Sequence, residues 1–179
     1  MNEQPTPRKP RVAVVFGGRS SEHAVSCVTA GSVLAVIDRE RYEVIPIGIS
    51  RDGKWVLDSG HPDRLAITDG RLPSVDESGA AIVLAGDPTA RQLVTAERGE
   101  VPRALGEVDV VFPLLHGAYG EDGTLQGLLE LAGVTYVGSG VLSSAVAMDK
   151  EYMKKLFVAA GLPVVDHIVV RAGEWERDK

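Results

Sequence analysis

The sequence predicts an α/β fold, with a mostly parallel β-sheet flanked by helices. The first observation is an apolar run, 12–16, that ends at Gly17-Gly18 and is followed by apolar residues at helical spacing and a second apolar run. The second is that this order returns from residue 108 onward. Apolar runs without alternation are typical of strands buried on both faces. Strands that alternate with helices predict a parallel sheet.

The first unit of the chain is a strand, a helix and a second strand. The helix is predicted over about 22–37, with Ser20 or Ser21 as its cap, because serine oxygen accepts hydrogen bonds from the first turn. The second strand is predicted over 42–49 and contains Pro46, which cannot donate to a ladder. This strand is therefore expected at or near an edge, or bulged at the proline.

The region between residues 51 and 107 has the weakest pattern. A short strand at 54–57 predicts a hairpin with the strand before it, and 80–85 and 92–95 predict two more short strands. Neither a helical pattern nor a chemical motif is evident there. Residues 60–107 are interpreted as an insertion that decorates the core.

Regular patterns return in the second half of the chain. A strand is predicted over 108–115, a helix over 124–132 and a fourth core strand over 134–137. Gly133 is well placed to end that helix. Four leucines of the helix are expected to pack inward: Leu125, Leu128, Leu129 and Leu131.

The last segment predicts two helices and a strand. The helices are expected over 141–148 and from Asp149, as their cap, to about residue 160, and the strand over 164–170. That strand, so close to the end of the chain, indicates that the chain stops inside a larger protein.

These patterns divide the chain into three parts. Residues 1–10 are polar and proline-rich and are expected to form a flexible arm. Residues 11–148 form the N-terminal α/β domain. Residues 149–179 are interpreted as a linker helix and the start, with its first strand, of a further domain.

Composition argues against several classes of function. The chain has 19 Lys and Arg against 25 Asp and Glu, and only 5% aromatic residues, so no nucleic-acid partner is expected. Its single cysteine, Cys27, cannot form an internal disulfide. No run approaches the ~20 apolar residues of a membrane span. No secretory signal is evident either, so a cytoplasmic protein without a membrane partner is expected.

Glu22 is the first candidate functional residue. It follows the turn after the first strand, and open α/β sheets bind ligands at the carboxyl ends of their strands. The turn reads G-G-R-S-S-E, which is not the dinucleotide fingerprint, and the chain has no phosphate-binding loop motif. Two readings remain open at equal weight. Glu22 either binds a small cationic group, such as the ammonium of an amino acid, or complements the helix dipole.

His116 is the second candidate. It directly follows a predicted buried strand and lies in a loop with three glycines, which favours a functional role over a structural one. It is expected at the same edge of the sheet as Glu22. In the same loop Glu121 and Asp122 could be metal ligands, but Asp122 suits a helix cap equally well. The cap is favoured and no metal site is predicted, because no further ligands are found.

Lys150 is the third candidate. A lysine in the first turn of a helix opposes the dipole, so it either lies on a solvated face or meets a phosphate group. The first reading is the commoner one for a single lysine. Cys27 is expected to pack inside its helix without a catalytic role.

Three stretches together resemble one family. The sequence VAVVFGGRSSEHAVS, 12–26, resembles the opening of D-alanine–D-alanine ligases. HGAYGEDGTLQG, 116–127, is similar to the second hallmark of that family, and YVGSGVLSSAVAMDK, 136–150, to its third. The resemblance spans roughly 11–170 and is loosest over 60–105.

The resemblance implies a fold and an activity. The fold is a pre-ATP-grasp, Rossmann-like N-terminal domain that binds substrate, followed by the start of the central ATP-grasp domain. The activity is ATP-dependent joining of two D-alanines through an acyl phosphate, which supplies peptidoglycan synthesis. A homodimer through the N-terminal domain is also implied.

The resemblance also assigns roles to particular residues. Glu22 would bind the ammonium of the first D-alanine and Val25 would contact its methyl side. His116, with Gly117 beside it, would lie at the carboxylate, and Lys150 would reach the ATP phosphates. Glu22 and His116 are thus the implied catalytic pair.

The family's other ATP and magnesium residues have no counterpart in these 179 residues. ATP and Mg²⁺ are therefore expected in the full-length enzyme, with neither bound to this fragment, which is expected to be inactive alone. Three alternatives remain: a D-alanine–D-lactate or D-alanine–D-serine ligase, a non-catalytic module that binds a small amino acid, and a nicotinamide dehydrogenase domain. The glycine spacing disfavours the last.

Overall fold

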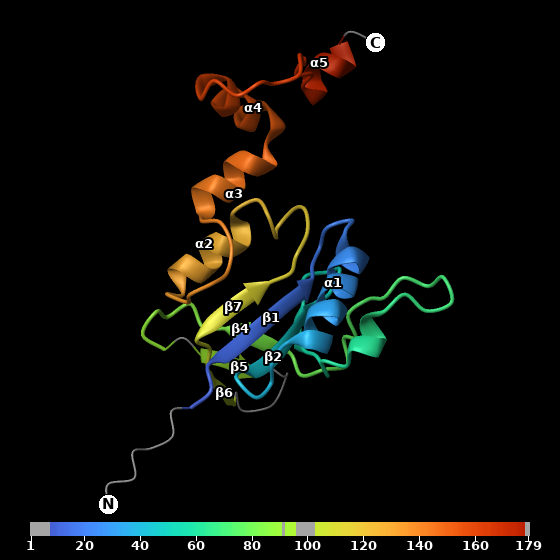
Figure 1. The fold of residues 1–179 in the computed structure, drawn as a ribbon, viewed down its shortest axis with the longest axis vertical. Coiled ribbons are helices and arrows are strands. Elements are labelled where there is room, and N and C mark those ends of the chain that lie inside the picture. Colours follow the sequence, from blue (N-terminus) through green and yellow to red (C-terminus); the bar gives the residue numbers. More distant parts are fainter. Residues whose placement is uncertain (1–7, 91, 96–102, 178–179) are drawn as a thin grey trace, which may run out of the picture.

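The computed structural model describes residues 8–90, 92–95 and 103–177. Its main sheet has the strand order β3-β2-β1-β7 (Figure 1). The bounds are Arg11–Gly17 for β1, Glu43–Ile49 for β2, Trp55–Leu57 for β3 and Val110–Pro113 for β7. Strands β2 and β7 pair with β1 in parallel, and β3 is antiparallel to β2. The predicted α/β class and the predicted hairpin are both confirmed.

Strand β1 is central and buried on both faces, as predicted. Residues 13–16 are fully buried. Alternate side chains point to opposite faces of a strand, so Val14 and Phe16 pack on one side and Ala13 and Val15 on the other. Helix α1, His23–Val36, covers the first side and contributes Cys27, Ala30 and Leu34 to its core.

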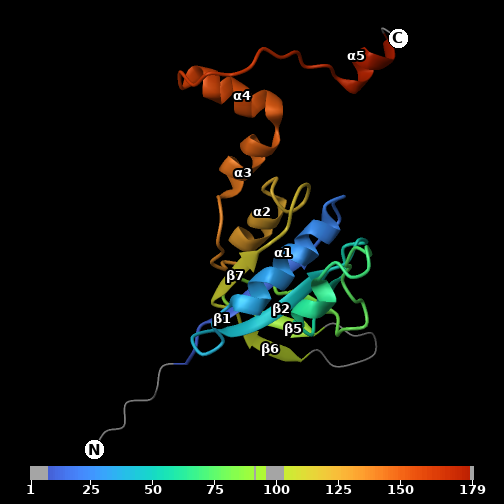
Figure 2. The ribbon, with the colours of Figure 1, turned by 45° about the vertical axis from the view of Figure 1, so that its right-hand side comes forward.

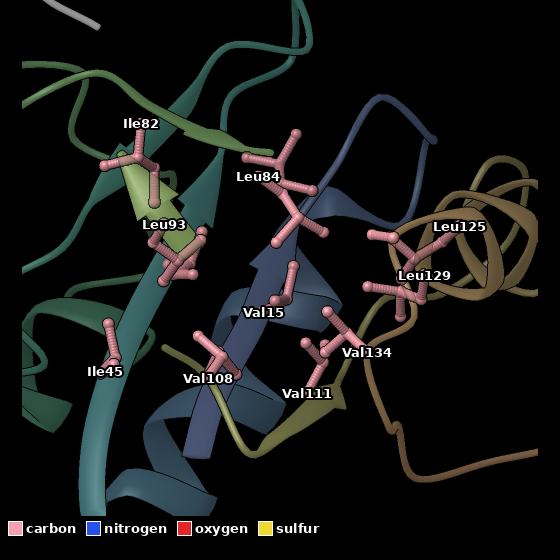
Figure 3. Close-up of a cluster of buried hydrophobic side chains, with 14 of the residues drawn as sticks. Val15, Ile45, Ile82, Leu84, Leu93, Val108, Val111, Leu125, Leu129 and Val134 are labelled. Carbon is pink, nitrogen blue, oxygen red and sulfur yellow. The ribbon is translucent and has the colours of Figure 1, made fainter. Parts of the chain in front are cut away.

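The second side of the main sheet is covered by a second sheet and by a helix. The second sheet is antiparallel, in the order β4-β5-β6, with bounds Ile82–Leu84, Gln92–Thr95 and Ala104–Glu107. Helix α2 spans Thr124–Leu131. Figure 3 shows Leu84 and Leu93 of the second sheet and Leu125 and Leu129 of α2 around Val15 of β1.

This arrangement corrects the interpretation of residues 60–107 as a decoration of the core. The two short strands predicted there exist, and a third, β6, joins them. Leu93 is 1% exposed, so the insertion supplies one wall of the core instead of lying outside it. The same region also forms a short 3₁₀ helix, Pro62–Leu65, which packs against α1 and was not predicted.

Pro46 lies in β2, one strand from the edge of the main sheet. Its carbonyl accepts a hydrogen bond from Asp58 N–H, beyond the last pair of the β2–β3 ladder. The N–H and C=O of a strand residue point the same way, so the missing donor of Pro46 faces the β3 side and no bond to β1 is lost. The predicted position near an edge is confirmed.

Two predicted strands are wrong or shorter than expected. The segment 134–137 forms one parallel bridge, Val111 to Tyr136, and no full strand. The segment 164–170 forms no ladder within the described residues, and nearly all of it is exposed. A strand needs a partner that supplies backbone hydrogen bonds, and no described part of the chain lies beside this segment as such a partner. The first strand of a further domain is therefore not formed here.

Helix α2 differs from its prediction in two of its four leucines. Leu125 and Leu129 are buried, but Leu128 is 38% and Leu131 75% exposed. Leu125 and Leu129 are four residues apart and share one face of the helix, whereas Leu128 and Leu131 lie on its flank. Gly133, with a φ of 63°, follows the helix as predicted.

Three further helices lead away from the domain (Figures 1 and 2). They are α3, Val141–Met148, α4, Lys150–Ala159, and α5, Ala172–Arg177. The predicted cap of α4 is confirmed, since Asp149 Oδ1 accepts from Glu151 N–H and Tyr152 N–H. Helix α5 was not predicted. Across the described residues, no helix has the length and apolar character needed to cross a bilayer.

The predicted flexible arm, 1–10, falls mostly outside the described residues. The part that is described is attached to the domain. Arg8 makes an ion pair with Asp109, and Lys9 donates to the carbonyl of Arg39.

Candidate functional site

The site forms where β1 and β7 end. These strands are parallel neighbours, so the loops that follow them leave the same edge of the sheet. Ser20, in the first loop, donates a hydrogen bond to the carbonyl of His116, in the second, at 2.6 Å. A Cβ atom placed on Gly117 would collide with Glu22 Oε2. The structure thus brings Glu22 and residues 116–117 together, although they lie more than 90 positions apart in the sequence.

Glu22 stands at the N-cap position of α1 and is exposed. Its side chain makes no capping hydrogen bond. Its backbone N–H donates to Ser20 Oγ at 3.1 Å, so Ser20 stabilises the approach to the helix without capping its first turn. The Glu22 carboxylate has no donor partner among the described residues, and it faces the second loop.

Gly117 allows the two loops to lie this close. Its φ is 72°, in the left-handed region that favours glycine. Its N–H donates to Glu121 Oε2 at 2.6 Å, which fixes the turn of the second loop. A larger residue would meet the Glu22 carboxylate, whose side chain is flexible enough to move away.

A Gly117→Ala variant is therefore expected to displace the Glu22 carboxylate. Gly161→Ala is the matched control, because Gly161 has a φ of 73° but open space where a Cβ would lie. Gly117→Ala should lower the free energy of unfolding by about 1–2 kcal/mol through backbone strain, whereas Gly161→Ala should strain only the end of α4, a helix with no buried residue. The carboxyl ¹³C resonance of Glu22 should shift in Gly117→Ala alone. An unchanged resonance would show that the contact does not set the position of Glu22.

Ser26 links the two loops through two hydrogen bonds of its hydroxyl group. Its Oγ accepts from Gly17 N–H at 2.8 Å and donates to the carbonyl of Leu114 at 2.7 Å. Ser26 is fully buried. One hydroxyl group therefore links the end of β1 to the end of β7.

His23 holds the turn at Gly17-Gly18 through a hydrogen bond of its ring. It is 1% exposed, its Nδ1 lies 2.7 Å from the carbonyl of Gly18, and its Nε2 accepts from Val75 N–H at 3.2 Å. A carbonyl can only accept, so Nδ1 carries the hydrogen and the ring is neutral. Burial lowers the pKa of His23, against a smaller raising effect of the Gly18 carbonyl.

Stability is accordingly expected to fall as the pH drops below about 6.5, the value for an unfolded histidine. In that range the unfolded chain binds a proton that the folded chain excludes, so acid favours unfolding. The contribution of His23 has a slope of at most about 1.4 kcal/mol per pH unit. Urea unfolding of the wild type and of His23→Gln across the pH range 5–8 measures it. Equal slopes in the two proteins would contradict the assignment.

His116 is partly buried and is held at two points, by Ser20 in the first loop and by Thr29 of α1. Its carbonyl accepts from Ser20, and its Nε2 lies 3.2 Å from Thr29 Oγ1. Thr29 Oγ1 also donates to the carbonyl of Val25 at 3.0 Å. Val25 is 54% exposed and lies on α1 three residues after Glu22, and therefore on the same face.

Lys150 lies apart from this group. It is the first residue of α4 and borders a cavity of about 410 Å³ with Ser139, Ser144 and Glu121. Glu121 also accepts from Gly117 N–H, so it lies between the two regions. A second cavity, of about 340 Å³, lies beneath the two loops and includes Trp55 and Leu125 in its lining.

The carboxylates of Glu121 and Asp122 accept hydrogen bonds from backbone N–H groups of the second loop and of the start of α2. Asp122 accepts from Tyr119 N–H and from Thr124 N–H, the first residue of α2, but the N-cap position expected for it is taken by Gly123. Burial raises the pKa of Asp122, but these hydrogen bonds outweigh it and the net pKa is lowered. In the described part of the chain, no group of three or more His, Cys, Asp or Glu residues is arranged to hold a metal ion.

Sequence reasoning missed the residues that hold the site together: Ser26, Thr29 and His23. A signal was present, because Ser26 and Thr29 follow Glu22 at helical spacing in the sequence. Cys27 is fully buried and burial raises its pKa to about 11, in keeping with the packing role expected for it.

Comparison with known proteins gives consistent matches. Residues 11–139 match the model of the family described as D-ala D-ala ligase N-terminus. A D-alanine--D-alanine ligase of Streptomyces avermitilis is 64% identical over 99% of this chain and 47% of that protein. One of Streptomyces coelicolor is 63% identical over 95% of this chain and 45% of that protein. The chain thus spans about half the length of the curated relatives it matches.

Solved structures match over a similar range. The D-Ala:D-Ser ligase VanG of Enterococcus faecalis is 34% identical, with a TM-score of 0.77 over 95% of this chain and 47% of that chain. The D-alanine-D-alanine ligase of Coxiella burnetii is also 34% identical, with a TM-score of 0.72 over 94% of this chain and 48% of that chain.

Proposed function

Because this chain belongs to the family of D-alanine–D-alanine ligase N-terminal domains, we propose that it is the substrate-binding N-terminal part of an ATP-dependent ligase that joins two D-alanines for peptidoglycan synthesis. The observation that carries the proposal is the Glu22 carboxylate, which has no donor partner among the described residues and lies against Gly117 beside His116. An exposed carboxylate that lacks a donor partner among the described residues suits an ammonium group.

In this proposal each residue of the site contacts a different part of the first D-alanine. Glu22 accepts hydrogen bonds from the ammonium, and such charge-assisted bonds contribute about 1.5–3 kcal/mol. Val25, exposed on the same face of α1, contacts the methyl group. His116 and the adjacent Gly117 lie at the carboxylate. Holding the ammonium and the carboxylate at fixed points orients the carboxylate for reaction.

ATP would supply the phosphoryl group that activates this carboxylate. Among the described residues Lys150 fits one contact to a phosphate, since its ammonium stands at the start of α4, where the helix dipole also favours an anion. Among the described residues, no group of three or more His, Cys, Asp or Glu could hold Mg²⁺ without further ligands.

A titration followed by NMR tests the proposal on this chain. D-Alanine is expected to shift the amide resonances of Glu22, Val25 and Gly117. D-Lactate, which has a hydroxyl group in place of the ammonium, should shift them far less, and L-alanine should bind more weakly than D-alanine. Equal shifts with D-alanine and D-lactate, or no shift with D-alanine, would refute the assignment of Glu22.

A second candidate reaction differs in its second substrate. The VanG structure is that of a D-Ala:D-Ser ligase and superposes on 95% of this chain. The D-alanine--D-alanine ligases of Streptomyces avermitilis and Streptomyces coelicolor are 64% and 63% identical to this chain, against 34% for VanG, so the joining of two D-alanines is favoured over the D-Ala:D-Ser reaction. A chimera that joins this chain to the C-terminal half of the Streptomyces avermitilis relative would test whether the chain supports ligation of D-alanine at all, through phosphate release from ATP.

The family also supports proposals on assembly and location. We propose a homodimer that acts in the cytoplasm. Sedimentation equilibrium distinguishes a monomer from a dimer of this 19.0 kDa chain.

A further inference from the structure

The contact between Thr29 and His116 carries a further inference. Thr29 Oγ1 has two neighbours, the carbonyl of Val25 at 3.0 Å and Nε2 of His116 at 3.2 Å. A hydroxyl group has one hydrogen, and a carbonyl can only accept. The hydrogen of Thr29 is thus directed to Val25, and Oγ1 can only accept from His116. The geometry therefore places a hydrogen on Nε2 of His116.

The other ring nitrogen of His116 is left for a ligand. Across residues 8–90, 92–95 and 103–177, His116 Nδ1 has no hydrogen-bond partner. When one ring nitrogen of a histidine is held by a neighbour, that bond sets the tautomer and the orientation of the ring. Thr29 thus determines which nitrogen is available and how the ring is oriented.

Helix α1 places both halves of the site in this way. Glu22, Val25 and Thr29 follow one another at intervals of three and four residues and share one face of the helix. Ser20, just before the helix, holds the backbone of His116 at 2.6 Å, and Thr29 holds its ring. One contact from α1 and one from the loop before it therefore hold His116 relative to the start of the helix, where Glu22 lies.

We propose that Thr29 is a positioning residue, whose hydroxyl group fixes the tautomer and orientation of His116 so that Nδ1 is presented to the substrate. The proposal rests on the proposed function, in which Glu22 and His116 bind D-alanine. Thr29 itself contacts no substrate in this scheme.

Three variants separate this role from a structural one. Thr29→Val removes the hydroxyl group and keeps the shape of the side chain, whereas Thr29→Ser keeps the hydroxyl group. Ser32→Ala is the matched control, because Ser32 Oγ makes the same type of bond to the carbonyl four residues earlier, that of Val28 at 3.2 Å, and is exposed.

Two measurements are made on each variant. The first is the ¹⁵N spectrum of the His116 ring, recorded where its signals are those of a neutral imidazole. The wild type should show the Nε2–H tautomer, and Thr29→Val should show a share of the Nδ1–H tautomer. The second is the D-alanine Kd by NMR titration. It should rise about three- to tenfold in Thr29→Val, the effect of one hydrogen bond, and stay near the wild-type value in Thr29→Ser and Ser32→Ala.

The proposal stands if Thr29→Val changes both measurements and Thr29→Ser restores both. It is overturned if Thr29→Val leaves either one at the wild-type value, if Thr29→Ser fails to restore them, or if Ser32→Ala has the same effect as Thr29→Val. Failure of the proposed function has a different signature. In that case the wild type itself binds no D-alanine, while the ring spectrum still reports whether Thr29 holds His116.

Discussion

A Glu22→Gln variant is expected to bind D-alanine about one to two orders of magnitude more weakly than the wild-type chain. Glutamine keeps the size of the side chain and one acceptor oxygen but lacks the charge, and a hydrogen bond to a charged group contributes about 1.5–3 kcal/mol. Because Glu22 is exposed and makes no capping bond, the free energy of unfolding should change by less than about 1 kcal/mol. NMR titration and urea unfolding measure the two quantities separately.

Glu40→Gln is the matched control for this experiment. Glu40 is an exposed residue just beyond the other end of α1, and its substitution changes the net charge by the same amount. It should leave the D-alanine affinity at the wild-type value. If Glu22→Gln also leaves it there, Glu22 complements the helix dipole and does not bind the ammonium, which is the reading that the sequence left open.

A Leu93→Ala variant is expected to lower the free energy of unfolding by about 2–5 kcal/mol. Leu93 is 1% exposed and packs in the same cluster as Val15 and Leu129, so its truncation removes buried apolar surface and leaves a cavity. This loss would be a large share of the 5–15 kcal/mol typical of a folded domain. Urea unfolding followed by far-UV circular dichroism measures it.

Val83→Ala serves as the control within the same small sheet. Val83 lies on β4, pairs with Val94 of β5 and is 52% exposed. Its truncation should change the free energy of unfolding by about 0.5 kcal/mol or less. Equal and small effects of both variants would mean that the second sheet is peripheral to the core.

The sequence was most informative where local pattern alone decides the structure. The apolar run that forms β1, the helical spacing of α1 and the Asp149 cap of α4 each depend on neighbours within a few residues. The prediction that Glu22 and His116 lie at one edge of the sheet needed one further inference. The carboxyl ends of parallel strands lie side by side, so the loops that follow them meet there.

The second sheet could not be predicted in full because strand pairing is not local. Its strands have only three or four residues each, too few to show a period. Strand β6 was missed for this reason. The segment 164–170 shows the converse, since its β-branched residues predict a strand that forms no ladder among the described residues. Whether such a segment becomes a strand depends on a partner.

By itself the sequence determined the α/β class, the strand-helix-strand unit, and the two loops that carry Glu22 and His116. Only the tertiary structure decided how those loops are joined: Ser26 linking the ends of β1 and β7, His23 holding the glycine turn, and Thr29 meeting a ring 87 positions away. The physical reason is that secondary structure follows from contacts close in sequence. A buried hydroxyl group or imidazole, in contrast, must satisfy its hydrogen bonds with whatever groups the fold brings beside it.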